Sequence, residues 1–223
     1  MTRIEASHTT KKLPLRLLVM LLLFLGAATL FLFIVNEVLM EKEVAVDNAV
    51  LQYLSTHVVS PRLTGFMQTV SFFASALFLQ IAYGIIVLIF LFQRKYAFAI
   101  LTAFTGVGGF IISYILKISF HRARPAHPLI DPLLTYSFPS GHATSAFIFY
   151  NFLGYLLWKI DLSKTIKIIG VIVLFLFPLL IGFSRMYLAV HFFSDVAAGF
   201  CVGLIWLLVI ILTFEKKVHL KTK

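Results

Sequence analysis

The chain has few charged residues and almost no cysteine. Charged side chains make up 13% of its 223 residues, against about 25% in ordinary globular proteins. Only 9 residues are acidic, whereas 19 are lysine or arginine. The single cysteine, Cys201, excludes an intramolecular disulfide and a cysteine-based metal cluster. Because Cys201 lies inside an apolar run, we expect it to be a packing residue.

Apolar residues, in contrast, are abundant. They account for 61% of the chain, and the mean hydropathy is +0.99. Because too few polar side chains remain to cover a surface in water, this composition predicts a lipid environment. In a soluble domain the formal charge of +10 would suggest nucleic acid. Here the charges lie between or beside apolar runs, so we expect no nucleic-acid partner and interpret them as a signal of membrane orientation.

Windows without charged residues predict six membrane spans, since a charge at the bilayer centre costs about 2.5–3.5 kcal/mol. The expected spans cover residues 15–36, 67–92, 96–117, 142–160, 166–184 and 195–214. The first window is longer than the apolar part of a signal peptide, so we expect a retained helix. The predicted fold is an all-α integral membrane protein in which six transmembrane helices form one domain, residues 1–223.

Lysines and arginines predict the orientation of this bundle. Most of them cluster near the N-terminus, at 94–95, at 159–167 and after residue 215, which places these segments and both termini in the cytoplasm. Six basic residues remain on the outer side: Lys42, Arg62, Lys117, Arg122, Arg124 and Arg185.

An outer segment, residues 37–65, separates the first two spans. It carries an apolar stripe at helical spacing, formed by Val46, Val50, Leu51, Leu54 and Val58. Such a stripe predicts a helix in the membrane interface. Two roles are open for it, a connector packed over the bundle and a part of a lipid entry path.

The first of three polar clusters lies at the outer end of the third span. Lys117 and Arg124 are seven residues apart, which places them about two turns apart on one helix face. Pro125 follows and disfavours helix at its predecessor. Taken alone, each cation can also be explained as an interface residue whose long side chain reaches from the apolar region to the water, without a role in a site.

The second cluster, Pro139-Ser140-Gly141-His142, directly precedes the fourth span. Ser140 is a favoured N-cap residue, and Gly141 lets the backbone approach a bound group. The start of a helix presents free N–H groups to an anion. His142, in the first turn, is placed to give a proton to a group held there.

The third cluster, Ser184-Arg185 with His191 and Asp195, ends just before the sixth span. If His191 and Asp195 lie on a helix, their i,i+4 spacing lets the carboxylate hold one ring N–H and leave the other nitrogen free as a nucleophile or base. The predicted topology brings all three clusters to the outer face. Three cations beside a helix N-terminus indicate a site for a phosphate-like dianion.

Together the clusters resemble the three-part signature of the type 2 phosphatidic acid phosphatase superfamily. The resemblance implies that His191 attacks phosphorus to form a phosphohistidine, that Asp195 orients His191, and that His142 protonates the leaving oxygen. It further implies that the phosphoryl oxygens are bound, without a metal or other cofactor, by Lys117, Arg124, Ser140, Gly141 and Arg185.

A site at the outer membrane–water boundary favours lipid substrates, because a headgroup can enter while its tails stay in the bilayer. The family implies phosphatidic acid, phosphatidylglycerol phosphate, undecaprenyl pyrophosphate or lipid A phosphates. It also implies a multi-pass protein of the bacterial inner membrane whose site faces the periplasm or cell exterior. No obligate protein partner is inferred.

Several alternatives stay open at this stage. His121, Arg122 and His127 either meet the second phosphate of a pyrophosphate or belong to a solvated loop. A haloperoxidase, a sugar phosphatase and an inactive scaffold fit the sequence less well than a lipid phosphatase. An anion-binding membrane carrier is the alternative from another functional class. Such a carrier would be expected to have basic residues inside its spans, whereas here the charges lie at the ends of the spans.

Overall fold

Helices account for all regular structure in the described part of the chain. The computed structural model describes residues 14–40, 42, 44–131 and 135–219, with side chains as far as Phe214. In chain order the elements are α1 (Leu15–Val35), the π-helical turn η1 (Asn36–Met40), α2 (Ala45–His57), α3 (Pro61–Phe72), α4 (Ala76–Phe92), α5 (Tyr96–Phe120), α6 (Gly141–Lys159), α7 (Lys164–Tyr187) and α8 (Phe193–His219).

Four segments are long and apolar enough to cross a membrane: Leu15–Met40, Tyr96–Phe120, Lys164–Tyr187 and Phe193–Phe214. The number rises to five if α3 and α4 together form one bent span. The expected count of six also requires α6, which is not among them. The six-span count therefore stays a prediction.

The α6 helix is the central element of the bundle and packs against α5, α7 and α8. It carries polar residues such as Thr144 and Asn151, but nine of its residues are buried, among them Phe149 and Phe152. Because neighbouring helices cover it, α6 does not need the apolar surface of a lipid-facing helix. Its bounds lie within one residue of the span expected at 142–160.

The span expected at 67–92 is not one continuous helix, and in this respect the prediction is wrong. The chain bends by 40° between α3 and α4. Ser75 ends the break, because its side chain accepts a hydrogen bond from the backbone N–H of Phe78 at 3.3 Å and caps α4. Hydropathy alone does not reveal such a break, since the residues around it are also apolar.

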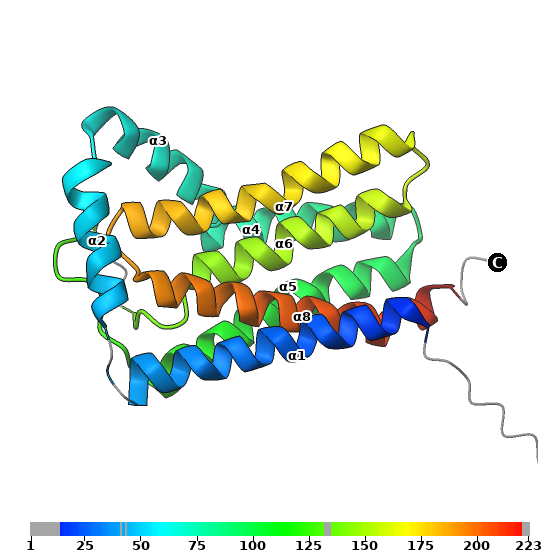
Figure 1. The fold of residues 1–223 in the computed structure, drawn as a ribbon. Helices are drawn as coiled ribbons and strands as arrows, with labels where there is room; N and C mark the ends of the chain where they lie inside the picture. Colours follow the sequence, from blue (N-terminus) through cyan, green and yellow to red (C-terminus); the bar gives the residue numbers. More distant parts are fainter. Residues whose placement is uncertain (1–13, 41, 43, 132–134, 220–223) are drawn as a thin grey trace, which may run out of the picture.

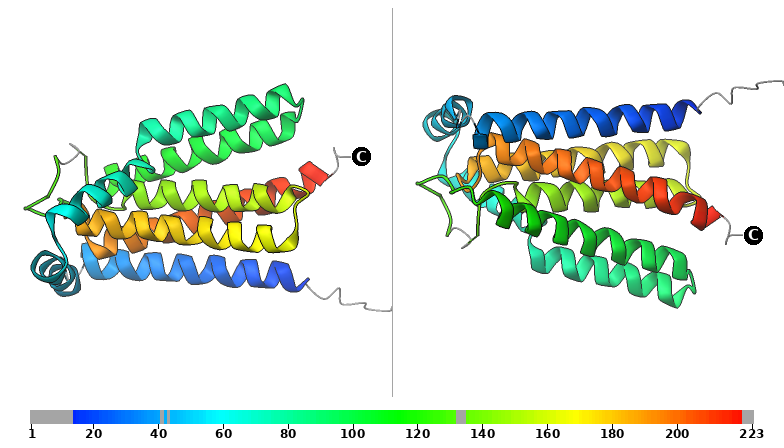
Figure 2. Two further views of the ribbon diagram at one scale, coloured as in Figure 1. Left: turned by 90° about the horizontal axis from the view of Figure 1, so that it is seen from above. Right: turned by 90° about the horizontal axis from the view of Figure 1, so that it is seen from below.

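The long helices run side by side, and α2 lies across one end of the bundle (Figure 1). Both views of Figure 2 show two further segments at this end of the bundle. One is the chain between α5 and α6, and the other is the junction of α7 with α8. The segment expected to form an interfacial helix thus contains a helix, α2, and its place relative to a membrane stays a prediction. Asp47 and Leu54 are its buried residues, whereas Val46 of the predicted apolar stripe is 64% exposed.

Near this end, α8 crosses the start of α6 at very short range. A Cβ atom at Gly199 would lie 2.8 Å from the carbonyl oxygen of Ser140 and 3.1 Å from Cβ of Ala143. The backbone N–H of Ser140 also donates to the carbonyl of Asp195 at 2.9 Å. The glycine therefore permits the contact that holds the N-terminus of α6 against the first turn of α8.

Candidate active site

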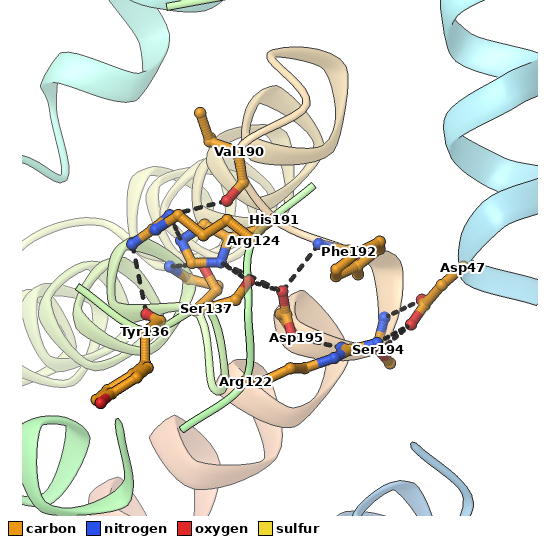
Figure 3. A network of polar contacts seen from close by, with 12 residues as sticks. Asp47, Arg122, Arg124, Tyr136, Ser137, Val190, His191, Phe192, Ser194 and Asp195 are labelled. Atoms are coloured by element: carbon orange, nitrogen blue, oxygen red, sulfur yellow. Dashed lines mark hydrogen bonds and ion pairs between the residues drawn. The ribbon is translucent and has the colours of Figure 1, made fainter. Parts of the chain in front are cut away.

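His191 and Asp195 lie together at the end of the bundle that α2 covers (Figure 3). Nδ1 of His191 is 3.4 Å from Oδ2 of Asp195, and both side chains are almost completely buried. Their contact agrees with the prediction, but the expected i,i+4 helix does not extend to His191. The imidazole stands in the turn before α8, and Oδ2 of Asp195 accepts the backbone N–H of Phe192 at 2.9 Å.

Burial gives His191 a neutral ring. Desolvation lowers its pKa to about 3, the Asp195 carboxylate opposes this change, and the charges of Lys117 and Arg124 reinforce it. With Nδ1 turned to Asp195, Nε2 faces the other way, 3.2 Å from Nη1 of Arg124. A neutral imidazole with one nitrogen oriented by a carboxylate has the arrangement that a histidine nucleophile needs.

Lys117 and Arg124 both bind the segment of chain that precedes α6. Nζ of Lys117 donates to the carbonyl of Tyr136 at 2.7 Å, and Nε of Arg124 donates to that of Thr135 at 2.8 Å. They do not share a helix face, so that expectation is wrong. The reason is that α5 ends at Phe120, where His121 adopts a left-handed conformation with φ 52°. Nη1 of Arg124 instead reaches the junction of α7 and α8, where it donates to Val190 O at 2.8 Å.

Ser140 caps α6 as predicted. Its hydroxyl oxygen accepts the backbone N–H of Ala143 at 3.4 Å. Gly141 lies beside Lys117, since a Cβ atom there would be 3.4 Å from Cε of the lysine. His142 follows in the first turn of α6 and is half-buried. The positive charges of Arg185, Lys117 and Arg124 are close enough to act on its ring.

Arg185 enters from the last turn of α7 and is 4% exposed. Its Nη1 donates to the hydroxyl of Ser71 on α3. Among the described residues, its Nε is the one buried side-chain nitrogen or oxygen without a hydrogen-bond partner. A buried charged donor left unpaired is costly, so this N–H is suited to an anionic ligand.

Arg122 and Ser137 also contact Asp195, although sequence reasoning assigned neither this role. Nη1 of Arg122 is 2.6 Å from Oδ1 of Asp195, and the hydroxyl of Ser137 donates to Oδ2. The interpretation of Arg122 as part of a solvated loop is therefore wrong, because its side chain is 9% exposed and is paired with Asp47 as well. Its contact with a second phosphate stays a prediction. His121 and His127 are exposed, in accordance with a solvated loop.

Asp47 of α2, the second ion-pair partner of Arg122, was also missed. The sequence held one signal for it, since Asp47 is spaced by four, seven and eleven residues from Leu51, Leu54 and Val58. That spacing puts the carboxylate on the helix face that packs inward.

Among the described residues, no group of three or more His, Cys, Asp and Glu side chains is arranged to hold a metal ion.

The sequence is similar to those of known proteins. The model of the PAP2 superfamily matches residues 94–219. Phosphatidylglycerophosphatase B of Bacillus subtilis (strain 168) is 36% identical over 110 residues, 48% of this chain and 53% of that protein. Undecaprenyl-diphosphatase BcrC of the same organism is 30% identical over 135 residues, 56% of this chain and 64% of that protein. The match thus spans about half the length of the first relative and less than two thirds of the second.

Two crystal structures share the fold. A transmembrane PAP2 type phosphatidylglycerolphosphate phosphatase from Bacillus subtilis superposes with a TM-score of 0.74 at 26% identity, over 88% of this chain and 96% of that one. Aquifex aeolicus LpxE gives a TM-score of 0.59 at 25% identity, over 76% and 97% of the two chains. Because the family match covers more than half of the sequence and includes His142, His191 and Asp195, the chain belongs to the PAP2 superfamily.

Proposed function

We propose that the protein is a membrane lipid phosphatase that hydrolyses a phosphate monoester or pyrophosphate through a phosphohistidine. The observation that carries this proposal is the buried His191–Asp195 pair, 3.4 Å apart, which leaves Nε2 of His191 beside the guanidinium of Arg124. A phosphoryl group held by Arg124 would lie next to this nitrogen. The names of the relatives, a phosphatidylglycerophosphatase and an undecaprenyl-diphosphatase, support lipid phosphates as the substrate class.

In the proposed reaction, Nε2 of His191 attacks phosphorus and the bond from phosphorus to the leaving oxygen breaks. His142 gives its proton to that oxygen, so a lipid alcohol or lipid phosphate departs. Water then attacks the phosphohistidine with His142 as base, which releases inorganic phosphate and restores the neutral His191. Lys117, Arg124 and Arg185, with the N-terminus of α6 at Ser140 and Gly141, would stabilise the charge on the phosphoryl oxygens.

Phosphate release in detergent tests this function. We expect the purified chain to release phosphate from phosphatidic acid, phosphatidylglycerol phosphate or undecaprenyl pyrophosphate faster than from glucose 6-phosphate. Lipid A is included as the alternative lipid substrate, because the family resemblance also implies lipid A phosphates. No release from any lipid would contradict the phosphatase proposal.

The same assay with EDTA tests the proposal that no metal is needed. We expect unchanged rates, because the cations of the site are themselves placed to neutralise the phosphate. Loss of activity on chelation, restored by an added divalent metal, would overturn metal independence while leaving the phosphatase function intact.

We further propose that residues 1–223 form one domain whose site faces the periplasm or cell exterior. The junctions of α4 with α5 and of α6 with α7 lie at the opposite end of the bundle from the junction of α7 with α8 (Figure 1). The first two junctions carry Arg94, Lys95, Lys159 and Lys164, and such residues favour the cytoplasm. The N-terminal basic residues Arg3, Lys11 and Lys12 belong to the same prediction but fall outside the described residues, as do Lys221 and Lys223 at the C-terminal end.

Reporter fusions test the orientation. Alkaline phosphatase, which is active only outside the cytoplasm, should be inactive when fused after Lys223. The matched fusion after Val58, beyond α1 and α2, should be active. The reverse pattern would place the site in the cytoplasm.

A further inference from the structure

Arg122 lies between two buried carboxylates that come from distant parts of the chain. Its Nη1 is 2.6 Å from Oδ1 of Asp195, and its Nη2 is 2.7 Å from Oδ2 of Asp47 (Figure 3). Asp195 and Asp47 are 0% and 3% exposed. Charged groups are seldom buried to this extent unless they are paired. The guanidinium therefore links α2 to the first turn of α8.

The two oxygens of Asp195 have different partners. Oδ1 faces Arg122, whereas Oδ2 accepts from Phe192 N at 2.9 Å and from the Ser137 hydroxyl, and lies 3.4 Å from Nδ1 of His191. With Oδ1 bound, the carboxylate cannot rotate without breaking a charged hydrogen bond. Arg122 thus determines which oxygen is presented to His191.

Further contacts hold Arg122 itself. Its guanidinium carbon is 4.3 Å from the centre of the Phe192 ring, and Nη1 donates to the Ser194 hydroxyl at 2.8 Å. Oδ1 of Asp47 accepts the backbone N–H of Ser194 at 2.9 Å. Asp47 therefore binds both the arginine and the turn of chain that carries Asp195.

We propose that Arg122 is a positioning residue of the phosphatase reaction, which orients Asp195 and through it His191, and that Asp47 of α2 holds Arg122 in place. This inference rests on the proposed function. Arg122 differs in role from Arg124, whose Nη1 contacts His191 directly at 3.2 Å. Arg122 instead contacts Asp195, which in turn contacts His191.

Steady-state kinetics of phosphate release from phosphatidic acid separate positioning from substrate binding. We expect Arg122→Gln to lower kcat about 10- to 100-fold, because a small misplacement of reacting groups costs about that much. KM should change by less than about twofold, and so should the inhibition constant of inorganic phosphate, because the proposed phosphate-binding residues stay in place. Arg122→Lys should recover part of kcat, since a lysine keeps one of the two ion pairs.

Asp47→Asn should lower kcat less than Arg122→Gln, because Arg122 keeps its contact with Asp195. Arg62→Gln serves as the matched control, since Arg62 is an exposed arginine at the start of α3. The control should leave both kcat and KM unchanged.

An unchanged kcat in Arg122→Gln would overturn the inference, and so would a rise in KM or in the phosphate inhibition constant at constant kcat. If Arg122→Gln does not fold, Arg122→Lys and Asp47→Asn decide, and normal kcat in both would overturn it. If the wild-type protein releases phosphate and these variants have the same kcat, the positioning role is refuted and the proposed phosphatase function stands. A wild-type protein without phosphatase activity would refute the proposed function and this inference with it.

Discussion

Replacement of His191 by alanine is expected to lower the rate of phosphate release by at least about 10⁴-fold, the scale seen when a covalent nucleophile is removed. The buried ring, with Nδ1 toward Asp195 and Nε2 toward Arg124, is the proposed attacking group. Without it, neither Asp195 nor the cations can form a covalent intermediate. Phosphate release from phosphatidic acid in detergent, normalised to folded protein, measures the loss.

The control for this variant is His57→Ala, which removes an exposed histidine from α2 and should retain full activity. Chemical quenching of the wild type with ³²P-labelled substrate should trap an acid-labile, base-stable label, as expected for a phosphohistidine. The label should be absent from His191→Ala. Activity or label that survives in His191→Ala would refute the nucleophilic role.

His142→Ala should have the second largest effect, and its size should depend on the leaving group. With a lipid phosphate monoester the departing alkoxide needs a proton, so we expect a loss of about 10²–10⁴-fold, the usual contribution of general acid–base catalysis. With p-nitrophenyl phosphate, the weakly basic phenolate leaves without help. Formation of the phosphohistidine, followed as the first burst of nitrophenolate, should therefore be nearly normal.

A comparison of the two substrates in the same preparation makes this test independent of folding. A misfolded variant would lose activity toward both, and His57→Ala should lose neither. Equal losses in the rate of phosphohistidine formation with the lipid and nitrophenyl substrates, in a folded His142→Ala protein, would show that His142 does not protonate the leaving group. Slower turnover after the burst is expected with both substrates, because His142 is also the proposed base of the second step.

The positions of the proposed catalytic residues were largely predictable from local sequence. The Ser140 cap depends on residues within one turn of helix, and the structure confirms it. His191 and Asp195 are four residues apart, so almost any compact turn brings them together, and they are in contact even though His191 is not helical. The apolar segments were also predictable, because hydropathy over about 20 residues is a local property.

Local interruptions were harder to predict. The break between α3 and α4 lies among apolar residues and depends on the Ser75 cap. The end of α5 at Phe120 depends on a left-handed residue, His121, which composition does not mark as a helix terminator. The end of α5 redirects Arg124 from the face of this helix toward the loop that carries His191.

By itself, the sequence determined that the chain is helical and apolar and that its histidines, aspartate and cations fall into three clusters, since these are properties of composition and short spacing. Only the tertiary structure decided that Arg122 joins Asp195 to Asp47, residues 73 and 75 positions away from it along the chain. Packing removes water from all three charged groups at once, and their mutual attraction and hydrogen bonds must offset this desolvation penalty. No local pattern specifies that event.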